Sequence, residues 1–259
     1  MANENSESNS VNLETNESEE LLSMLPPCPN SNKEELKTFE IPSYLTDVYN
    51  WAYVKPKNID FLDRPLSYHI ILFGQGWKLM EEYLKEINEG TKMLQIAHVY
   101  GNIIPEMVKK IGTKGHLDVI DAVPYQLERL KTKLQGIPHS NVEMWVQDAS
   151  TIFHREYNTI GIYFLLHEVP NITKIKIIDN ALKAIKETNG KLIFIDYHNP
   201  AAYNPVRPIL KLVNTFLEPF AHVMWSKEIK DFANNADEFN WEKTTYFMGA
   251  YQKVVVTKK

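Results

Sequence analysis

Cysteine is almost absent from this chain, in which Cys28 is the only example. One cysteine cannot form an internal disulfide, and a cysteine-based zinc site needs several thiolates. The sequence also lacks any apolar run of the roughly 18 residues that a membrane-spanning helix requires. We therefore expect a chain that does not cross a membrane, which leaves contact with a membrane surface open.

Basic stretches are missing as well. The formal net charge is -5 at pH 7, and eight acids against two lysines give residues 1–38 a net charge of -6. The rest of the chain is thus about neutral, at +1, and shows no basic stripe for phosphates, so we expect no nucleic-acid partner. The acidic N-terminal segment has no Arg, and we expect it not to act as an Arg-rich transit peptide.

The remaining composition divides the chain into three regions. Residues 1–40 combine low hydrophobicity, a bias to Asn, Ser and Glu, and a proline-rich break, which predicts a disordered acidic tail. Residues 41–90 are expected to form a helical cap, because apolar residues from Leu66 to Ile87 recur every three or four positions as the stripe of one helix. Residues 91–259 are expected to form a Rossmann-like domain with an apolar insertion near 201–238.

Strand-like and helix-like segments alternate through this last region. The expected strands are Met93–Ala97, His116–Ile120, Val142–Val146, Thr159–Leu165 and Lys191–Ile195, and the expected helices are Ile103–Ile111, Pro124–Leu134, Ile172–Ile185 and one from Pro205 to about Phe220. Two final runs, Lys243–Phe247 and Ala250–Val256, are so close in sequence that they can only pair antiparallel. The pattern predicts a doubly wound α/β sheet of five parallel strands plus a C-terminal antiparallel hairpin, which resembles the class I methyltransferase architecture.

The loop after the first expected strand lies where a nucleotide cofactor binds in such sheets. Asp121 follows Gly101 by twenty residues, the spacing at which these folds place the acid that accepts ribose hydroxyls. A pyrophosphate loop needs several small residues for close backbone approach, and here only Gly101 would permit it. The loop therefore argues against a dinucleotide and favours a cofactor without phosphate, S-adenosylmethionine (SAM).

Polar residues follow the other expected strands, at the edge where ligands bind in parallel sheets. Asp148 with Ala149 stands where the adenine amino group would be bound, although Asp148 would also serve as a turn cap. His167 with Glu168, and Asp196 with Tyr197 and His198, follow neighbouring strands. Imidazole and carboxylate side chains that converge there suit a divalent ion such as manganese or iron, or acid-base chemistry, and a hydrogen-bonded structural histidine is the simpler alternative.

Apolar and aromatic residues gather in the insertion. Leu210, Val213, Phe216, Leu217 and Phe220 recur at helical spacing in a segment flanked by Lys211 and Lys227. Core packing accounts for such a pattern, as does a cap over an apolar substrate. A surface helix that docks on a membrane is the third interpretation.

Several short strings are more specific than these general patterns. They are Ile41–Leu45 (IPSYL), Trp51–Val54 (WAYV), Val99–Asn102 (VYGN), Leu117–Asp121 (LDVID), Phe164–Glu168 (FLLHE), Asp196–Pro200 (DYHNP) and Leu217–Phe220 (LEPF). Through them the chain, from about Ile41 to Thr257, resembles the rhodoquinone-biosynthesis family RquA, a divergent branch of the methyltransferase superfamily.

That resemblance implies an activity and a set of residues. The family converts ubiquinone to rhodoquinone, replacing a ring methoxy group by an amino group taken from SAM, with manganese present. The implied cofactor residues are Gln95, Ala97, Tyr100, Gly101, Asp121, Asp148 and Ala149. The implied catalytic residues are His167, Glu168, Asp196, Tyr197 and His198, all of which except Tyr197 are also implied metal ligands.

Ubiquinone is carried by a membrane, so the resemblance also implies a partner surface. We expect the protein to associate peripherally with the quinone-containing inner membrane, from the cytoplasm or inside mitochondria. Two other functions stay open at this point: an ordinary SAM-dependent methyltransferase acting on a quinone or phenol, and a non-catalytic adaptor that kept the fold. The polar residues retained at the strand ends disfavour the adaptor.

Overall fold

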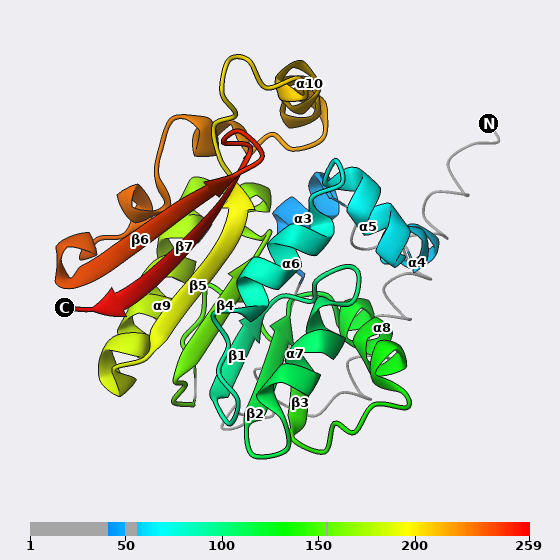
Figure 1. The fold of residues 1–259 in the computed structure, drawn as a ribbon, viewed down its shortest axis with the longest axis vertical. Helices are drawn as coiled ribbons and strands as arrows, with labels where there is room; N and C mark the ends of the chain where they lie inside the picture. Colours follow the sequence, from blue (N-terminus) through cyan, green and yellow to red (C-terminus); the bar gives the residue numbers. More distant parts are fainter. Residues whose placement is uncertain (1–40, 50–55, 154) are drawn as a thin grey trace, which may run out of the picture.

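The computed structural model describes residues 41–49, 56–153 and 155–259. The predicted acidic tail, with Trp51 and Tyr53 of the predicted cap, lies outside the described residues. Within them, seven strands form one sheet in the order β3-β2-β1-β4-β5-β7-β6 (Figure 1). The strands are β1 Lys92–Ile96, β2 His116–Asp121, β3 Val142–Val146, β4 Thr159–Tyr163, β5 Lys191–Tyr197, β6 Phe239–Tyr246 and β7 Tyr251–Lys258.

The pairing of these strands confirms the predicted fold class. β1 pairs in parallel with β2 and β4, β2 with β3, and β4 with β5, while β7 is antiparallel to both β5 and β6. Strand β4 ends at Tyr163, before the predicted end at Leu165. The reason is local, because Phe164 adopts a left-handed φ of 51° that no extended strand continues.

Helices cover both faces of the sheet (Figure 1). They are α3 Ser43–Asp47, α4 Pro56–Leu62, α5 Pro65–Ile71, α6 Gly76–Leu84, α7 Ile103–Ile111, α8 Pro124–Leu134, α9 Asn171–Thr188 and α10 Arg207–Phe216, with short 3-10 turns Leu166–Glu168, His222–Trp225, Ile229–Phe232 and Ala236–Glu238. Apolar side chains of α6, α7 and α8 fill the core on one face, and those of α9 fill the other. The central strands β1 and β4 are therefore buried on both sides, as a doubly wound sheet requires.

Close packing of α6 on the sheet depends on one glycine of β4. A Cβ atom on Gly161 would lie 1.7 Å from the Tyr83 hydroxyl, which donates to Gln95 Oε1 of β1 at 2.6 Å. Any larger residue at Gly161 would push α6 away from the strands that carry the cofactor loop.

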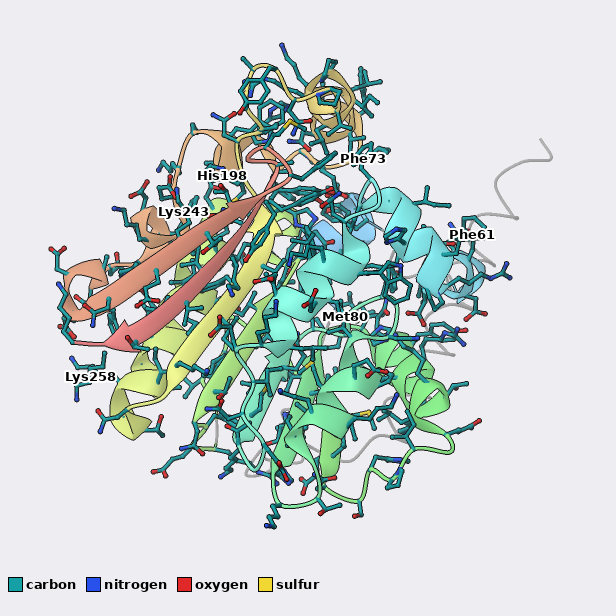
Figure 2. All side chains as sticks on the ribbon, in the orientation of Figure 1. Phe61, Phe73, Met80, His198, Lys243 and Lys258 are labelled. Carbon is teal, nitrogen blue, oxygen red and sulfur yellow. The ribbon has the colours of Figure 1, made fainter. Side chains whose placement is uncertain are left out.

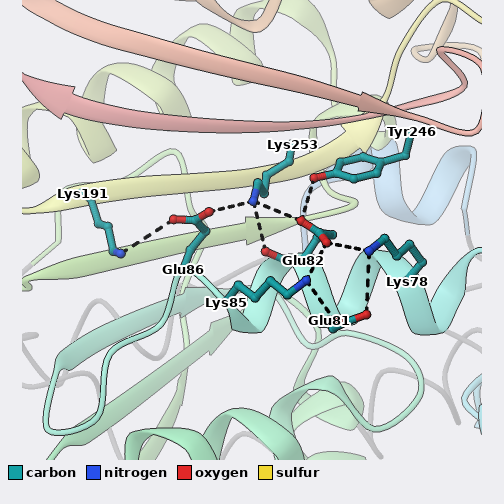
Figure 3. Close-up of polar contacts among 8 residues, drawn as sticks. All are labelled: Lys78, Glu81, Glu82, Lys85, Glu86, Lys191, Tyr246 and Lys253. Carbon is teal, nitrogen blue, oxygen red and sulfur yellow. Dashed lines mark hydrogen bonds and ion pairs between the residues drawn. The ribbon is translucent and has the colours of Figure 1, made fainter.

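The same helix is fastened to the C-terminal hairpin by charged side chains (Figure 3). Lys253 donates at 2.7 Å to Glu86, which lies just past the end of α6, and the Tyr246 hydroxyl donates at 3.0 Å to Glu82 within the helix. Hydrogen bonds from Lys78 and Lys85 lower the pKa of Glu82 to about 2. Glu82 therefore stays ionised at any ordinary pH, and it links α6 to a strand more than 160 residues away in sequence.

The prediction of one helix from Leu66 to Ile87 is wrong. Phe73 and Gly74 take left-handed φ angles of 51° and 80°, which end α5 and turn the chain before α6 begins. The turn shifts the helical phase, so that Leu66, Ile70 and Trp77 of the predicted core stripe are 68%, 64% and 47% exposed. Other apolar residues form the buried side: Tyr68, Leu72, Leu79 and Tyr83.

The predicted apolar face of the insertion also divides. Leu210 is buried, and Phe220 packs partly against Leu45, Tyr49 and Val123. Phe216, in contrast, is 74% exposed at the end of α10, and Ile209 and Leu212 on the same helix are exposed as well. One side of α10 is core, as the first interpretation held, and the other side is exposed among the described residues.

Candidate active site

A hollow lies beyond the carboxyl ends of the parallel strands and opens to solvent. Its walls come from the loops after β1, β2, β3, β4 and β5, from α3 and α5 of the cap, and from the insertion. We call it the central pocket.

Eight of the twelve predicted site residues line this pocket. They are Ala97, Tyr100, Asp121, Asp148, Ala149, His167, Glu168 and Tyr197. The other four, Gln95, Gly101, Asp196 and His198, lie outside its wall.

Asp121 is held by the backbone at the end of β2. Its Oδ2 accepts from the N–H of His98 and its Oδ1 from the N–H of Val123, both at 2.8 Å. Burial nevertheless outweighs these two donors and raises the pKa of Asp121 to about 6. Further donors, such as the two hydroxyls of a ribose, would stabilise the ionised carboxylate and are what this position lacks.

Asp148 combines the two roles considered for it. Its Oδ1 accepts from the N–H of Ser150 at 2.7 Å, so it caps the turn after β3. The residue also lines the central pocket beside Ala149, where an adenine ring would lie in this architecture.

The loop after β1 is shaped by side chains in place of glycines. His98 is buried, its Nε2 accepts from Lys133 Nζ at 3.0 Å, and its Nδ1 donates to Gln126 Oε1 at 2.8 Å. Burial, helped by the Lys133 charge, holds the pKa of His98 well below its usual range, so the imidazole is neutral. Ala97 has a left-handed φ of 67°, a conformation usually left to glycine, and Tyr100 presents its ring to the pocket.

Gln95 and Gly101 do not border the cofactor as the resemblance implied. The Gln95 side chain is fully buried on the α6 face of the sheet, where it accepts from Tyr83. The Gly101 N–H points away from the pocket and donates to Asp63 Oδ1 at 3.0 Å. Gln95 is instead covered by α6, and its Nε2 donates to the carbonyl of Ile96 at 2.9 Å.

The opposite wall of the pocket holds a buried ionic cluster. His167 Nδ1 donates to Asp196 Oδ1 at 2.8 Å, and His167 Nε2 lies 3.4 Å from Glu168 Oε1. Burial alone would lower the pKa of His167, but Asp196, Glu168 and Glu218 together raise it to about 9. His167 is therefore an imidazolium at neutral pH, hydrogen-bonded to Asp196. Asp196 is itself held in place, because its Oδ2 accepts from the N–H of Leu166 at 2.8 Å.

Sequence reasoning missed Glu218 as a site residue. It lies in the insertion, lines the pocket, and has a pKa raised by burial although the nearby His167 charge and the Tyr49 hydroxyl oppose the shift. The available signal was an acid inside the apolar string Leu217–Phe220, because charged residues are seldom buried without a partner. Tyr68 and Tyr163, whose hydroxyls lie 2.5 Å apart, were also missed; they belong to the same pocket wall.

The four predicted metal ligands are not brought together. His198 lies on the hairpin side of β5, where its Nδ1 donates to the carbonyl of Gly249 and Lys243 approaches its Nε2 at 3.4 Å (Figure 2). In the described part of the chain, the potential metal ligands within mutual reach are instead His116, Asp118 and Glu143, on strands β2 and β3. The four residues predicted to bind manganese therefore do not form one metal site at the central pocket.

Comparison with known proteins agrees with this geometry. The profile of the ubiE/COQ5 methyltransferase family matches residues 51–246. The chain belongs to this family. The comparison with curated proteins gave no match.

Several solved structures resemble this chain in fold. The pyocyanin biosynthetic protein PhzM superposes with a TM-score of 0.58 at 12% identity, covering 78% of this chain and 61% of its own. The mitomycin 7-O-methyltransferase MmcR gives 0.59 at 14% identity, with 87% and 66% coverage. A SAM-dependent methyltransferase from Aquifex aeolicus gives 0.52 at 19%, with 79% and 99% coverage. The chain thus spans less than two thirds of PhzM, and these identities speak for the fold alone.

Membership in the ubiE/COQ5 family implies that the protein uses SAM, and the pocket fits the adenosine half. Asp121 ends β2 and Asp148 follows β3, and both line the pocket where ribose and adenine would lie in this architecture. Ala97, Tyr100 and Ala149 would border the same molecule. None of the helices in the described ranges combines the length and the apolar character needed to cross a bilayer.

Proposed function

We propose that this chain is a SAM-utilising transferase that converts ubiquinone to rhodoquinone, replacing a ring methoxy group by an amino group derived from SAM. The observation that carries the proposal is the protonated His167 among Asp196, Glu168 and Glu218 on the pocket wall opposite the SAM acids. The sequence strings shared with the RquA family point to the same activity.

The charge state of the cluster suits this replacement. Addition of the SAM nitrogen to the quinone ring places negative charge on a ring oxygen, and the departing methoxy group takes a proton and leaves as methanol. The bond between the nitrogen and the Cα of SAM must then break: the quinone takes up the two electrons of the Cα–H bond, and water hydrolyses the resulting imine, which leaves the amino group on the ring of the quinol. An imidazolium beside the ring can donate to either oxygen, and the carboxylates of Glu168 and Glu218 can accept a proton from the entering nitrogen. Methyl transfer to a phenol needs a base instead, and His167 held as an imidazolium is a poor base.

The loop after β1 also favours a departure from ordinary methyl transfer. In the usual loop, glycines let the backbone approach the amino-acid end of SAM. Here His98 and Tyr100 occupy such positions, and Gln95 is turned away from the pocket. A changed hold on that end of SAM is what transfer of its nitrogen, rather than its methyl group, would require.

A second part of the proposal concerns where the enzyme meets its substrate. α5 exposes Leu66, Ile70 and Ile71, and α10 exposes Ile209, Leu212 and Phe216. Neither helix carries an acid, whereas Arg207 and Lys211 lie on α10. Ile71 also lines the pocket, so the α5 face continues into it.

We propose that these two apolar faces dock on the anionic surface of the quinone-containing inner membrane, in the cytoplasm or in mitochondria. Both helices lie beyond the carboxyl edge of the sheet, where the pocket opens (Figure 1). Each fully buried large apolar side chain contributes about 1.5–3 kcal/mol, so a few of them give reversible attachment. Ubiquinone could then enter from the bilayer without leaving it entirely.

The direct test uses purified protein, ubiquinone in detergent or vesicles, and SAM labelled with nitrogen-15 in its amino group. We expect a product with the mass of rhodoquinone that carries the heavy nitrogen, formed roughly 10²–10⁴-fold more slowly with His167→Ala. If ubiquinone is unchanged and a quinone or phenol with a free hydroxyl, offered in its place, gives a product heavier by one methyl group, the quinone methyltransferase would replace our proposal. Absence of any SAM-dependent product, with SAM binding intact, would favour the non-catalytic adaptor.

A further inference from the structure

A buried carboxylate of the cap contacts the cofactor loop directly. Asp63 follows α4, and its side chain is inaccessible to solvent. Its Oδ1 accepts from the N–H of Gly101 at 3.0 Å and from Lys133 Nζ at 2.8 Å, and its Oδ2 accepts from Arg129 Nε at 2.8 Å. One side chain thus joins the cap, the loop after β1, and helix α8.

Lys133 extends this connection to two more atoms of the loop. Its Nζ donates to the carbonyl of Val99 at 3.0 Å and to His98 Nε2 at 3.0 Å, in addition to Asp63. The three acceptors come from two separate segments, and they account for the three N–H groups of an ammonium. The Lys133 side chain is only 9% exposed, so these contacts replace nearly all of its hydration.

His98 continues the chain of contacts to the pocket wall. Its Nδ1 donates to Gln126 Oε1, and Gln126 Nε2 lies 3.4 Å from the hydroxyl of Tyr100, which lines the central pocket. A glycine at position 98 could make none of these side-chain contacts. The histidine that makes the loop unusual is therefore used to hold it in place.

We infer that Asp63 is a positioning residue of the SAM site, which fixes residues 97–101 through Gly101 and Lys133 and makes the cap part of that site. The inference concerns SAM binding, which the family implies, and it holds whichever acceptor the enzyme uses. Its failure can therefore be told apart from failure of the rhodoquinone proposal.

Removal of the charge should expose the coupling. Asp63→Asn keeps an oxygen for Gly101 but leaves the buried Lys133 without its carboxylate, and Arg129 with only the half-exposed Asp60. We expect the Kd for SAM, measured by calorimetry on folded protein, to rise about tenfold, the change that corresponds to 1.4 kcal/mol. Hydrogen exchange of the segment 97–101 should become faster.

Asp60→Asn is the matched control, because Asp60 makes the same change of charge close to the same arginine. It is half exposed and lies 3.5 Å from Arg129 without touching the loop. We expect SAM affinity and loop exchange to stay at wild-type values in Asp60→Asn. Equal weakening by both variants would mean that net charge, and not the contact with the loop, controls binding.

A purely structural role for Asp63 predicts a different pattern. In that case Asp63→Asn would lower the melting temperature while the folded protein bound SAM within twofold of wild type and exchanged its loop normally, and the inference would be overturned. Should Asp63→Asn not fold, Lys133→Met combined with Asp63→Asn removes both charges and decides the question. Wild-type SAM affinity in that pair would overturn the inference, and a rise in Kd of about tenfold would support it.

Discussion

At the ends of β2 and β3, the acids of the central pocket are held by backbone N–H groups a few residues away or in the adjoining loop, as Asp121 is by His98 and Val123. At the ends of β4 and β5, charged side chains also hold one another: His167 donates to Asp196, which accepts from the N–H of Leu166 as well, and Glu218 comes from a third segment. We call these the SAM half and the acid-base half of the pocket.

The difference has an electrostatic consequence. Backbone donors carry no net charge, so burial prevails in the SAM half and the pKa of Asp121 rises to about 6. In the acid-base half, several negative charges surround one imidazole, so attraction prevails over burial and the pKa of His167 rises to about 9. In the SAM half, Asp121 would therefore be stabilised by hydrogen-bond donors of a ligand. In the acid-base half, His167 already carries a proton.

The largest effect is expected in the acid-base half. His167→Ala removes the proton donor, and general acid catalysis contributes roughly 10²–10⁴-fold to a rate. We expect kcat to fall by that factor while SAM affinity stays near wild type, measured by product formation and calorimetry. His198→Ala, which changes a histidine turned toward the hairpin, should stay within about twofold in kcat. A His167→Ala enzyme with normal kcat would show that the cluster is structural.

The next largest effect is expected in the SAM half. Asp121→Ala should weaken SAM binding by about 1.5–3 kcal/mol, the scale of hydrogen bonds to a charged group. Calorimetry on the folded variant measures this loss, and the exposed Asp237→Ala should leave the affinity unchanged. If Asp121→Ala binds SAM normally, the two halves do not divide the work as described here.

A smaller effect should follow from pH. Because Asp121 of the free protein has a pKa of about 6 and hydroxyl donors favour its ionised form, SAM should bind best above pH 6. Affinity should then decline as pH falls through 6, by up to about tenfold per pH unit. His167 stays protonated throughout this range, since its pKa is about 9. A titration of Kd between pH 5 and 8 checks this, and Asp121→Asn should give a flat profile; an equal slope in that variant would assign the effect to another group.

The same contrast explains how far the sequence could lead. Asp121 and Asp148 were predictable because one local rule, an acid at the end of a strand, sufficed to place them, and the five parallel strands were predictable from alternating apolar segments. Glu218 and the contact of Asp63 with the loop depend on segments distant in sequence, and no local pattern locates them. His198 failed for a related reason, since it follows the end of β5 and is held by the carbonyl of Gly249, a residue of the hairpin that is distant in sequence.

The apolar periodicity of residues 66–87 also gave a wrong prediction, because a turn at Phe73 and Gly74 interrupts the helix. The stripe through Leu66, Ile70 and Trp77 is regular in sequence, but the turn at Phe73 and Gly74 separates two helices whose buried sides do not align. The residues that periodicity assigned to the core therefore contribute an exposed apolar face. Leu66 and Ile70 thus belong to an exposed apolar face of α5, in addition to the one on α10.

The smallest effect is expected at this exposed surface. It tests whether the end of α10, next to the acid-base half, contacts a membrane. Phe216 is 74% exposed at the end of α10. Phe216→Glu should reduce flotation with quinone-loaded anionic vesicles by about tenfold. The change removes a side chain that would be buried in the membrane, and it adds a negative charge that the anionic lipids repel. Activity on long-tailed ubiquinone should fall a few-fold, and activity on a short-tailed analogue should hold, since only the former must be taken from the bilayer. Thr257→Glu adds the same charge to an exposed site on β7 and should float as wild type does. If Phe216→Glu still floats while both quinones react more slowly, the end of α10 is a wall of the active site and the membrane contacts another surface.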